Sequence, residues 1–190
     1  MHLISLRGLL ITMTRLDLFI QTQRIEMAKR FLGPGARVLD LGCADGSLFK
    51  HIPEIHGIGI DPTLAAPIDL PNAHLLPGRF PDDMATESDF DFVTMLAVLE
   101  HLPPAVQSKL GADCYRALRP KGRVIITVPS AKTDLLLSAL KAVHLIHGIT
   151  LEEHYGFDIR ETPALFSTFD VVMKKSFQLG LNNLFVFAKA

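Results

Sequence analysis

The chain has 190 residues, which fits one globular domain, and we expect a single domain over residues 1–190. Hydrophobic residues make up 48% and charged residues 21% of the sequence, so the chain has enough apolar material for a core. The net charge of −1 argues against the wide basic face that nucleic-acid binding needs, and we expect no nucleic-acid partner.

The first 13 residues are apolar and are predicted to form a frayed lead-in to this domain. Arg7 interrupts the apolar run and no small-residue cleavage site follows, so the pattern of a secretory signal peptide is not met. No uninterrupted apolar stretch is long enough to span a bilayer. The two cysteines, Cys43 and Cys114, are interpreted as reduced thiols, and we expect a cytoplasmic protein without a membrane span.

In the first half of the chain, short apolar runs alternate with helix signals and turns. Apolar residues at helical spacing predict a helix over residues 16–31, which Gly33-Pro34-Gly35 ends. A shorter helix begins at Ser47 and is closed by Pro53. Buried strands are predicted over residues 37–41, 57–60, 73–76 and 90–96.

The second half continues the alternation and then ends in two strands. Pro103 and Pro104 predict the start of a helix that runs to about Leu118. Further strands are expected over residues 123–128, 171–178 and 184–188, and further helices over residues 133–147 and 162–168. This order predicts a doubly wound α/β fold with a mostly parallel sheet and an antiparallel terminal hairpin.

The densest local signal is a glycine turn between the first strand and the next helix. The segment Val38 to Leu48 reads V-L-D-L-G-C-A-D-G-S-L, so a buried strand runs into a turn that begins and ends with glycine. Glycine permits positive φ angles and the close approach of a ligand to the backbone. The turn lacks the G-x-G-x-x-G pattern of dinucleotide-binding proteins and the Gly-Lys-Ser/Thr of phosphate loops.

An acidic residue, Asp61, follows the next strand, where its carboxylate is placed to accept hydrogen bonds from the two hydroxyls of a ribose. Strand, glycine turn, helix, strand and acid together indicate a nucleoside-binding half-fold. The alternative is that Asp61-Pro62 is only a turn that ends the strand.

Four segments, in the same order along the chain, resemble the class I S-adenosylmethionine-dependent methyltransferases. They are the glycine turn, the strand from Gly57 to Asp61, the segment from Phe90 to Pro103, and Leu118 to Val124. The match is closest to the small type 11/12 members, which modify metabolites, quinones and glycoconjugates. The resemblance implies a seven-stranded sheet with the last strand inserted antiparallel, and S-adenosylmethionine as cofactor.

The resemblance also implies roles for residues at the carboxyl ends of the strands, the edge at which open α/β sheets bind ligands (the ligand edge). Gly42 and Gly46 would line the methionine half of the cofactor while Asp40 holds the loop. Asp61 would hold the ribose, and the backbone of Leu96 would meet the methionine end. Cys43 lies inside the same turn, where the family uses cysteine for packing, and nothing in the sequence is placed to activate it as a nucleophile.

The chain departs from the family pattern at three positions. Ala44 replaces the middle glycine of the turn, and Lys121 replaces the first glycine of the fourth segment. Arg79 stands where the family usually has an acid that binds the amino group of adenine, and arginine has no hydrogen-bond acceptor.

Without an acid at position 79, the adenine amino group would be bound by a backbone group, by Asp82 or by Asp83, or the site is altered. Stacking of Phe80 on the adenine ring is a further alternative. As a lone aromatic residue, Phe80 also fits the core.

Two histidines are candidates for acid–base chemistry at the acceptor. His101 follows the fourth strand, and His154 lies in a loop beyond the fifth strand, a region where related proteins close over the acceptor. The alternative for His101 is a structural role at the start of the helix that follows. Histidine, cysteine and carboxylate residues nowhere show the spacing of a metal site.

We therefore expect methyl transfer from S-adenosylmethionine to a small-molecule acceptor: a metabolite, a quinone or a glycoconjugate intermediate. The apolar segment from Thr133 to Thr150 fits core packing, an apolar acceptor pocket or a homodimer face. A non-catalytic module that binds S-adenosylmethionine or S-adenosylhomocysteine is the second hypothesis, favoured by Ala44, Arg79 and Lys121.

Overall fold

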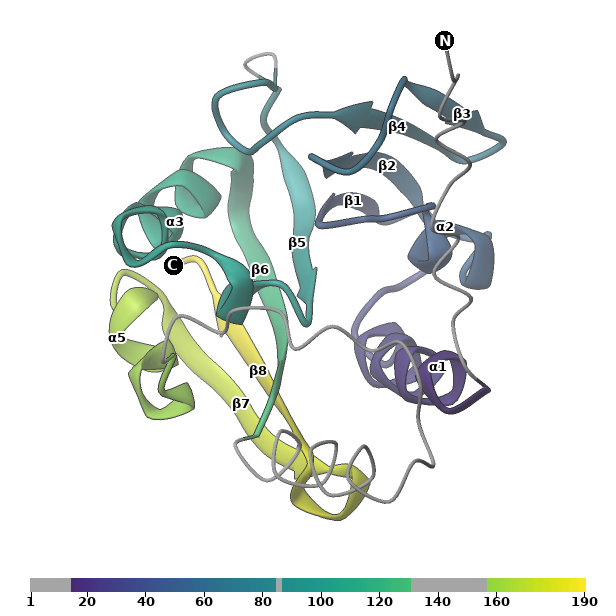
Figure 1. Cartoon of the computed structure of the whole chain (residues 1–190). Coiled ribbons are helices and arrows are strands. Elements are labelled where there is room, and N and C mark those ends of the chain that lie inside the picture. Colours follow the sequence, from purple (N-terminus) through teal and green to yellow (C-terminus); the bar gives the residue numbers. More distant parts are fainter. Residues whose placement is uncertain (1–14, 85–86, 131–156) are drawn as a thin grey trace, which may run out of the picture.

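A computed structural model describes residues 15–84, 87–130 and 157–190 of the chain. Its strands form one eight-stranded sheet in the order β3-β4-β2-β1-β5-β6-β8-β7 (Figure 1). The strands are β1 (Arg37–Leu41), β2 (His56–Asp61), β3 (Ile68–Leu70), β4 (Ala73–Pro77), β5 (Phe90–Leu96), β6 (Leu118–Pro129), β7 (Asp170–Phe177) and β8 (Asn182–Ala188).

Four α-helices and three short 3-10 turns, of which one follows β5, accompany the described strands. The helices are α1 (Arg15–Lys29), α2 (Ser47–His51), α3 (Pro104–Ala117) and α5 (Thr162–Leu165), and the 3-10 turn after β5 is η1 (Leu99–His101). None of the helices within the described ranges combines the length and the apolar character needed to cross a membrane.

The predicted α/β fold is confirmed, with one additional strand. The central strands β4, β2, β1, β5 and β6 are parallel, and β8 lies antiparallel between β6 and β7. The additional strand, which the sequence does not predict, is β3; it pairs antiparallel with β4 at the edge of the sheet. It is only three residues long and two of them are exposed, so its sequence carries no alternating apolar pattern.

Most boundaries lie within a few residues of those predicted, and β6 differs most. The sequence predicts that this strand begins at Arg123, after a turn at Pro120 to Gly122, whereas β6 already begins at Leu118. Phe90 of β5 pairs with Leu118, but the next paired residue, Phe92, faces Arg123, so the turn is absorbed as an irregularity within the ladder. Lys121 in this irregularity has a φ angle of 63°.

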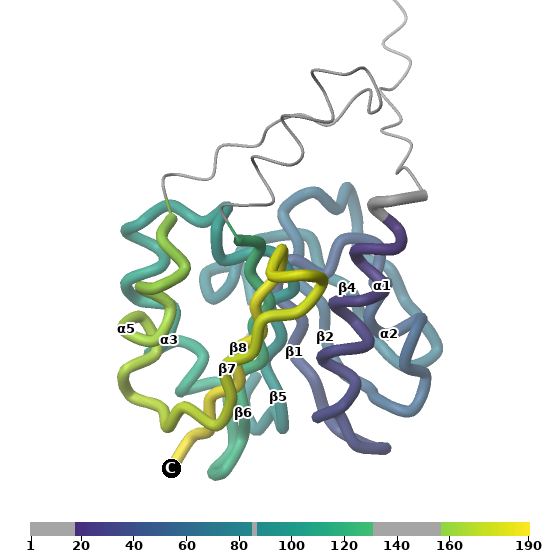
Figure 2. The backbone as a smooth tube through the Cα atoms, turned by 90° about the horizontal axis from the view of Figure 1, so that it is seen from below, coloured from purple at the N-terminus to yellow at the C-terminus, as the bar shows by residue number. Residues whose placement is uncertain are grey.

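The helices form a layer on each face of the sheet, with α1 and α2 on one face and α3 and α5 on the other (Figure 2). Two apolar clusters fill the two interfaces. The α1 and α2 side buries Ile25, Leu48 and Phe49 against the sheet. The α3 and α5 side buries Leu110 and a set of phenylalanines in which Phe166 stacks on Phe187 at 5.1 Å between ring centroids. Apolar packing therefore supports the sheet, and with it the strand ends, from both faces.

Several expectations lie outside the described residues. They are the lead-in over residues 1–13, the helix over residues 133–147 and the loop that contains His154.

A glycine in the middle of α3 gives a test of the packing between α3 and α5. A Cβ on Gly111 would lie 2.3 Å from the backbone oxygen of Leu165, so no side-chain movement relieves the clash. Alanine in place of glycine normally stabilises a helix interior by about 0.5–1 kcal/mol. We predict the opposite here: Gly111→Ala lowers the free energy of unfolding by about 1–3 kcal/mol, as measured by urea denaturation.

Gly33→Ala is the matched control, because a Cβ at Gly33 meets nothing within 4 Å. We expect this variant to stay within about 0.5 kcal/mol of the wild type. A Gly111→Ala variant that is as stable as the Gly33→Ala variant would show that α3 and α5 do not pack as described.

Candidate active site

The glycine turn lies at the carboxyl end of β1 and is tied to the end of β2. The backbone N–H of Gly42 donates to the carbonyl oxygen of Ile60 at 2.8 Å, and the N–H of Gly46 closes the turn by donating to Cys43 O at 2.8 Å. Gly42 and Gly46 have φ angles of 71° and 80°. These are conformations that glycine adopts without strain, so the two glycines are needed for the shape of the turn.

Asp61, at the end of β2, is held against this turn. Its Oδ2 atom accepts the N–H of Ala44 at 2.8 Å, and its Oδ1 atom accepts the N–H and the hydroxyl of Thr63 at 2.8 and 2.6 Å. The residue is 6% exposed. The glycine turn and the acid after the next strand predict that the first two strand ends lie together, and the hydrogen bond from Ala44 joins them directly.

Ala44 has a backbone conformation that glycine adopts without strain. Its φ angle is 47°, in the left-handed region that costs an L-residue about 1–2 kcal/mol. The same holds at Lys121, with a φ angle of 63°. Both departures from the family pattern therefore keep the glycine-type backbone, and the hydrogen bond to Asp61 is one interaction that holds Ala44 in place.

Asp40 lies below the turn, within β1, and is almost fully buried. The hydroxyl of Thr94 on the neighbouring strand β5 donates to its Oδ1 atom at 2.6 Å. Burial raises the pKa of Asp40 to about 7; the hydrogen bond from Thr94 opposes this rise, and the nearby charge of Asp61 adds to it. Thr94 was not singled out in the sequence, because only the register of β1 against β5 places it opposite Asp40.

Cys43 is packed within the turn. A Cβ on Gly59 of β2 would lie 2.6 Å from its sulfur, which shows how closely the thiol fits against that strand. Burial raises the pKa of the Cys43 thiol, so this cysteine is a poor nucleophile. Its observed contacts are those of a packing residue.

The end of β5 faces the glycine turn from the other side. A Cβ on Gly42 would lie 2.4 Å from the Val98 side chain, so the turn and the segment after β5 are in close contact. Leu96 ends the strand beside Thr127 of β6, and Ala97 follows it with a φ angle of 62°. A non-glycine residue in the left-handed region often marks a functional site. Val98 and Ala97 carry no motif that points to them in the sequence.

His101 lies in η1, directly beyond this segment. Its side chain is 32% exposed, and its Nε2 atom is 3.8 Å from the Oε1 atom of Glu100. The preceding residue, Glu100, is itself only 2% exposed. His101 therefore has access to solvent beside a buried carboxylate, a position that suits either the acid–base or the structural role.

A buried polar group under α1 was not predicted. Arg24 of α1 donates from its Nε atom to Asn182 of β8 at 3.0 Å. Burial lowers the pKa of Arg24, while the charge of Glu100 acts in the opposite direction. Arg24 and Asn182 are 158 residues apart in sequence, so no local pattern links them.

The segment after β4 contains the remaining cofactor candidates. Gly78 extends the strand by donating its N–H to the carbonyl oxygen of Asp61 at 3.2 Å. The N–H of the exposed Arg79 donates to the carboxylate of Asp83 at 2.9 Å. The structure thus brings Arg79 and Asp83 to the strand end beside Asp61.

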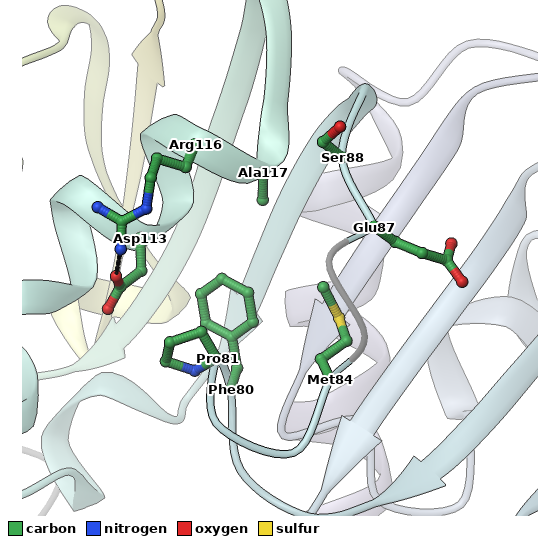
Figure 3. Close-up of a pocket in the computed structure, with 8 residues that line it drawn as sticks. All are labelled: Phe80, Pro81, Met84, Glu87, Ser88, Asp113, Arg116 and Ala117. Atoms are coloured by element: carbon green, nitrogen blue, oxygen red, sulfur yellow. Dashed lines mark hydrogen bonds and ion pairs between the residues drawn. The ribbon is translucent and has the colours of Figure 1, made fainter.

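Phe80 turns away from the strand end toward α3. It packs against the core cluster on that face and lines a groove of about 280 Å³ together with Pro81, Met84 and the last turn of α3 (Figure 3). Ser88, which precedes β5, also lines the groove, so the groove reaches toward the amino ends of the strands. This packing fits the core alternative for Phe80, and its stacking on adenine stays a prediction.

Six of the sequence-based candidates lie along the carboxyl ends of β1, β2 and β5: Asp40, Gly42, Cys43, Gly46, Asp61 and Leu96. His101 and Arg79 lie at the two sides of this group. His154 lies outside the described residues. Within the described part of the chain, histidine, cysteine, aspartate and glutamate residues form no group of three or more that would hold a metal ion.

Comparison with known proteins agrees with this geometry. A family model described as a methyltransferase domain matches residues 15–164. No curated protein sequence matches the chain. The chain belongs to the methyltransferase-domain family, as the sequence motifs predicted.

Solved structures with the same fold include the PH0226 protein from Pyrococcus horikoshii, with a TM-score of 0.71, 14% identity and 93% of each chain covered. A TehB-like S-adenosylmethionine-dependent methyltransferase from Corynebacterium glutamicum has a TM-score of 0.63 and 17% identity, with 88% of this chain and 87% of that chain covered. CalO1, a methyltransferase in calicheamicin biosynthesis solved with S-adenosylhomocysteine bound, has a TM-score of 0.65 and 14% identity, with 92% and 55% covered. The predicted class, a class I methyltransferase with a Rossmann-like fold, is confirmed.

Ala44 gives a test of the strained turn. Because Ala44 has a φ angle of 47°, Ala44→Gly removes a left-handed strain of about 1–2 kcal/mol, partly offset by the greater freedom of glycine in the unfolded chain. We predict a gain of about 0.5–1 kcal/mol in the free energy of unfolding. The control is Ala105→Gly in the exposed first turn of α3, which should lose about 0.5–1 kcal/mol. A loss in both variants would contradict the left-handed assignment.

Asp40 gives a pH-dependent test. Its pKa is raised from 3.8 to about 7 in the folded chain, so between these values the folded state holds a proton that the unfolded state releases. The free energy of unfolding therefore falls as the pH rises through this window, by about 1.4 kcal/mol for each pH unit. Asp40→Asn cannot ionise and should lack this fall. Urea denaturation of both proteins at pH 5 and pH 8 measures the difference, and a constant gap between the two proteins would refute it.

Proposed function

We propose that this methyltransferase binds S-adenosylmethionine across the carboxyl ends of β1 and β2 and transfers its methyl group to a small-molecule acceptor. The observation that carries the proposal is the buried carboxylate of Asp61, 2.8 Å from the backbone N–H of Ala44 in the glycine turn. A nucleoside ligand needs a carboxylate for its ribose and a backbone without side chains beside it, and these two features adjoin here.

The residues present fit the cofactor. A carboxylate accepts about four hydrogen bonds. Asp61 receives three within the described residues, one from Ala44 and two from Thr63, so capacity for a ribose hydroxyl is left. A second ribose hydroxyl would take the place of the Thr63 hydroxyl on Oδ1 if that hydroxyl rotates away. Gly42 and Gly46 would let the methionine half approach the backbone, and Leu96 would present its backbone at the far end.

When bound, the cofactor supplies a methyl group on a positively charged sulfur, which is an excellent leaving group. The protein's main task is then to hold the nucleophile of the acceptor in line with the methyl group, since alignment alone accounts for much of such catalysis. His101 would accept a proton from an acceptor that must lose one, because its side chain is 32% exposed beside the ligand edge. His154 is proposed to act from the loop beyond β6.

Several facts favour a small acceptor. The net charge of −1 gives no broad attraction for nucleic acid. Proteins of similar fold include CalO1, a methyltransferase in calicheamicin biosynthesis, and PhzM, a pyocyanin biosynthetic protein. A metabolite, a quinone or a glycoconjugate intermediate is the proposed acceptor class. Cys43 and Cys114 are both free and buried, which supports a reducing compartment such as the cytoplasm.

The sequence departures favour a non-catalytic module, but the backbone angles at two of these positions do not add support for it. Ala44 and Lys121 were two of the three departures that favoured it, and both keep positive φ angles as glycine would. Arg79 is the remaining departure.

Asp61 gives the test of the cofactor site. Asp61→Ala removes the proposed ribose contact, so we predict that S-adenosylhomocysteine, which raises the melting temperature of the wild type, no longer does so for the variant, and that calorimetry shows affinity lowered by at least about 100-fold. Asp69→Ala is the control, because Asp69 lies on β3 with a side chain that is 87% exposed.

Circular dichroism of the Asp61→Ala variant shows whether the fold survives the loss of the hydrogen bonds to Ala44 and Thr63. Unchanged affinity in a folded variant would remove the cofactor-site assignment.

A further inference from the structure

Three large apolar side chains are exposed at the ligand edge. Leu179, in the turn between β7 and β8, is 100% exposed, and Leu18 and Phe19 of α1 are each exposed over about half of their surface. Apolar surface left in water forgoes the free energy of burial. Single exposed residues of this kind are ordinary, whereas a group of them marks an interaction site. Their meaning therefore depends on whether the three lie on one side of the molecule.

The turn that carries Leu179 projects from the carboxyl end of β6. The N–H of Ser130, directly after β6, donates to Leu181 O at 2.8 Å, and the N–H of Leu181 closes the turn on Gln178 O at 3.1 Å. Gln178 and Leu179 have φ angles of 51° and 56°, in the left-handed region that L-residues avoid. The fold thus holds a leucine in water on a strained backbone, and such strain often marks a functional site.

The start of α1 reaches the same edge. Arg24, in the middle of the helix, donates to Asn182 at the first residue of β8, which pairs with the last residue of β6. Leu18 and Phe19 precede Arg24 by five and six residues, so they lie about 8 Å further along the helix axis. Because the other end of α1 leads to the beginning of β1, this displacement points past the carboxyl ends of the strands. In Figure 2 the start of α1 and the turn between β7 and β8 lie toward the same end of the strands.

The form of this apolar group suits a lipid bilayer better than a second protein chain. A stable protein interface buries about 800 Å² and about 20–30 residues on each side, far more than three side chains on two separate elements supply. A bilayer takes up protruding apolar side chains without a matching surface, and binding grows with the apolar area inserted. Residues 1–14, which join α1 at this edge, continue the apolar character in sequence, with Arg7 as their single lysine, arginine, aspartate or glutamate.

We propose that Leu18, Phe19 and Leu179 insert into the surface of a lipid bilayer and so dock the ligand edge on a membrane. The turn from Gln178 to Leu181 contains no charged residue, so docking depends on apolar burial rather than on attraction to anionic lipids. An active site at this edge then faces the bilayer and takes a lipid-soluble acceptor, a quinone or a lipid-borne glycoconjugate intermediate. That last consequence rests on the proposed function, whereas the docking itself does not.

Cosedimentation of the full chain with phosphatidylcholine vesicles tests the docking. The wild type should bind these neutral vesicles equally at low and at high salt. Leu179→Ser and Phe19→Ser should each lower the partition coefficient by about tenfold, because each variant loses one inserted apolar side chain. Val171→Ser is the matched control: Val171 is also about half exposed but lies at the start of β7, at the opposite end of that strand from the turn, and this variant should bind like the wild type.

Tryptophan reporters give a second readout that does not depend on the amount of protein bound. The chain contains no tryptophan, so a single introduced indole reports on its own surroundings. Leu179→Trp should show a blue-shifted emission with vesicles and quenching by brominated lipids, whereas Val171→Trp should show neither. The full exposure of Leu179 means that these substitutions remove no packing contact from the fold.

A wild type that binds no vesicles, binding that is lost at high salt, or equal losses in Leu179→Ser and Val171→Ser would overturn the proposal. A dimer in light scattering that Leu179→Ser dissociates, without vesicle binding, would assign the surface to a second copy of the chain and overturn it as well. S-adenosylhomocysteine should still raise the melting temperature of Leu179→Ser. A chain that binds vesicles but not S-adenosylhomocysteine keeps the docking and loses the proposed function, so the two proposals fail separately.

Discussion

The hydrogen bond between the Ala44 N–H and the Asp61 carboxylate is the interaction on which the rest of the site depends. It joins the turn after β1 to the end of β2 at 2.8 Å and keeps both beside the sheet edge. The sheet makes the bond available, because parallel pairing sets Leu41 against Ile60 and so brings the two strand ends to the same level. Without it, the left-handed Ala44 loses one of the interactions that hold it, and the Asp61 carboxylate keeps only its two bonds from Thr63.

This constraint explains why departures from the family pattern leave the architecture intact. Ala44 and Lys121 both stand where glycine is usual, and both hold positive φ angles. A strain of about 1–2 kcal/mol at each position is small beside the burial of two apolar clusters against the sheet. The scaffold therefore imposes the backbone, and the side chain at these positions matters less than the hydrogen bonds around it.

The two carboxylates at the ligand edge, Asp40 and Asp61, have different surroundings. Asp40 is buried beside Thr94 and has a pKa of about 7, whereas Asp61 lies above it with its charge met by two backbone N–H groups and a hydroxyl. Two carboxylates close in space thus serve different ends: Asp40 supports the turn from below, and Asp61 faces the proposed ligand. Arg24 and Glu100 extend this polar edge beneath α1 toward β8.

The sequence by itself determined the alternation of strands and helices, the terminal hairpin, the glycine turn and the acid after the second strand, because each is set by local periodicity or by residue types within a few positions. The tertiary structure alone decided the contacts between distant residues: Thr94 opposite Asp40, Val98 against Gly42, and Arg24 on Asn182. It also packed Phe80 against the core cluster and brought Asp83 to the end of β4. Such pairings follow from strand register and loop path, which depend on the packing of the whole sheet and leave no local pattern in the chain.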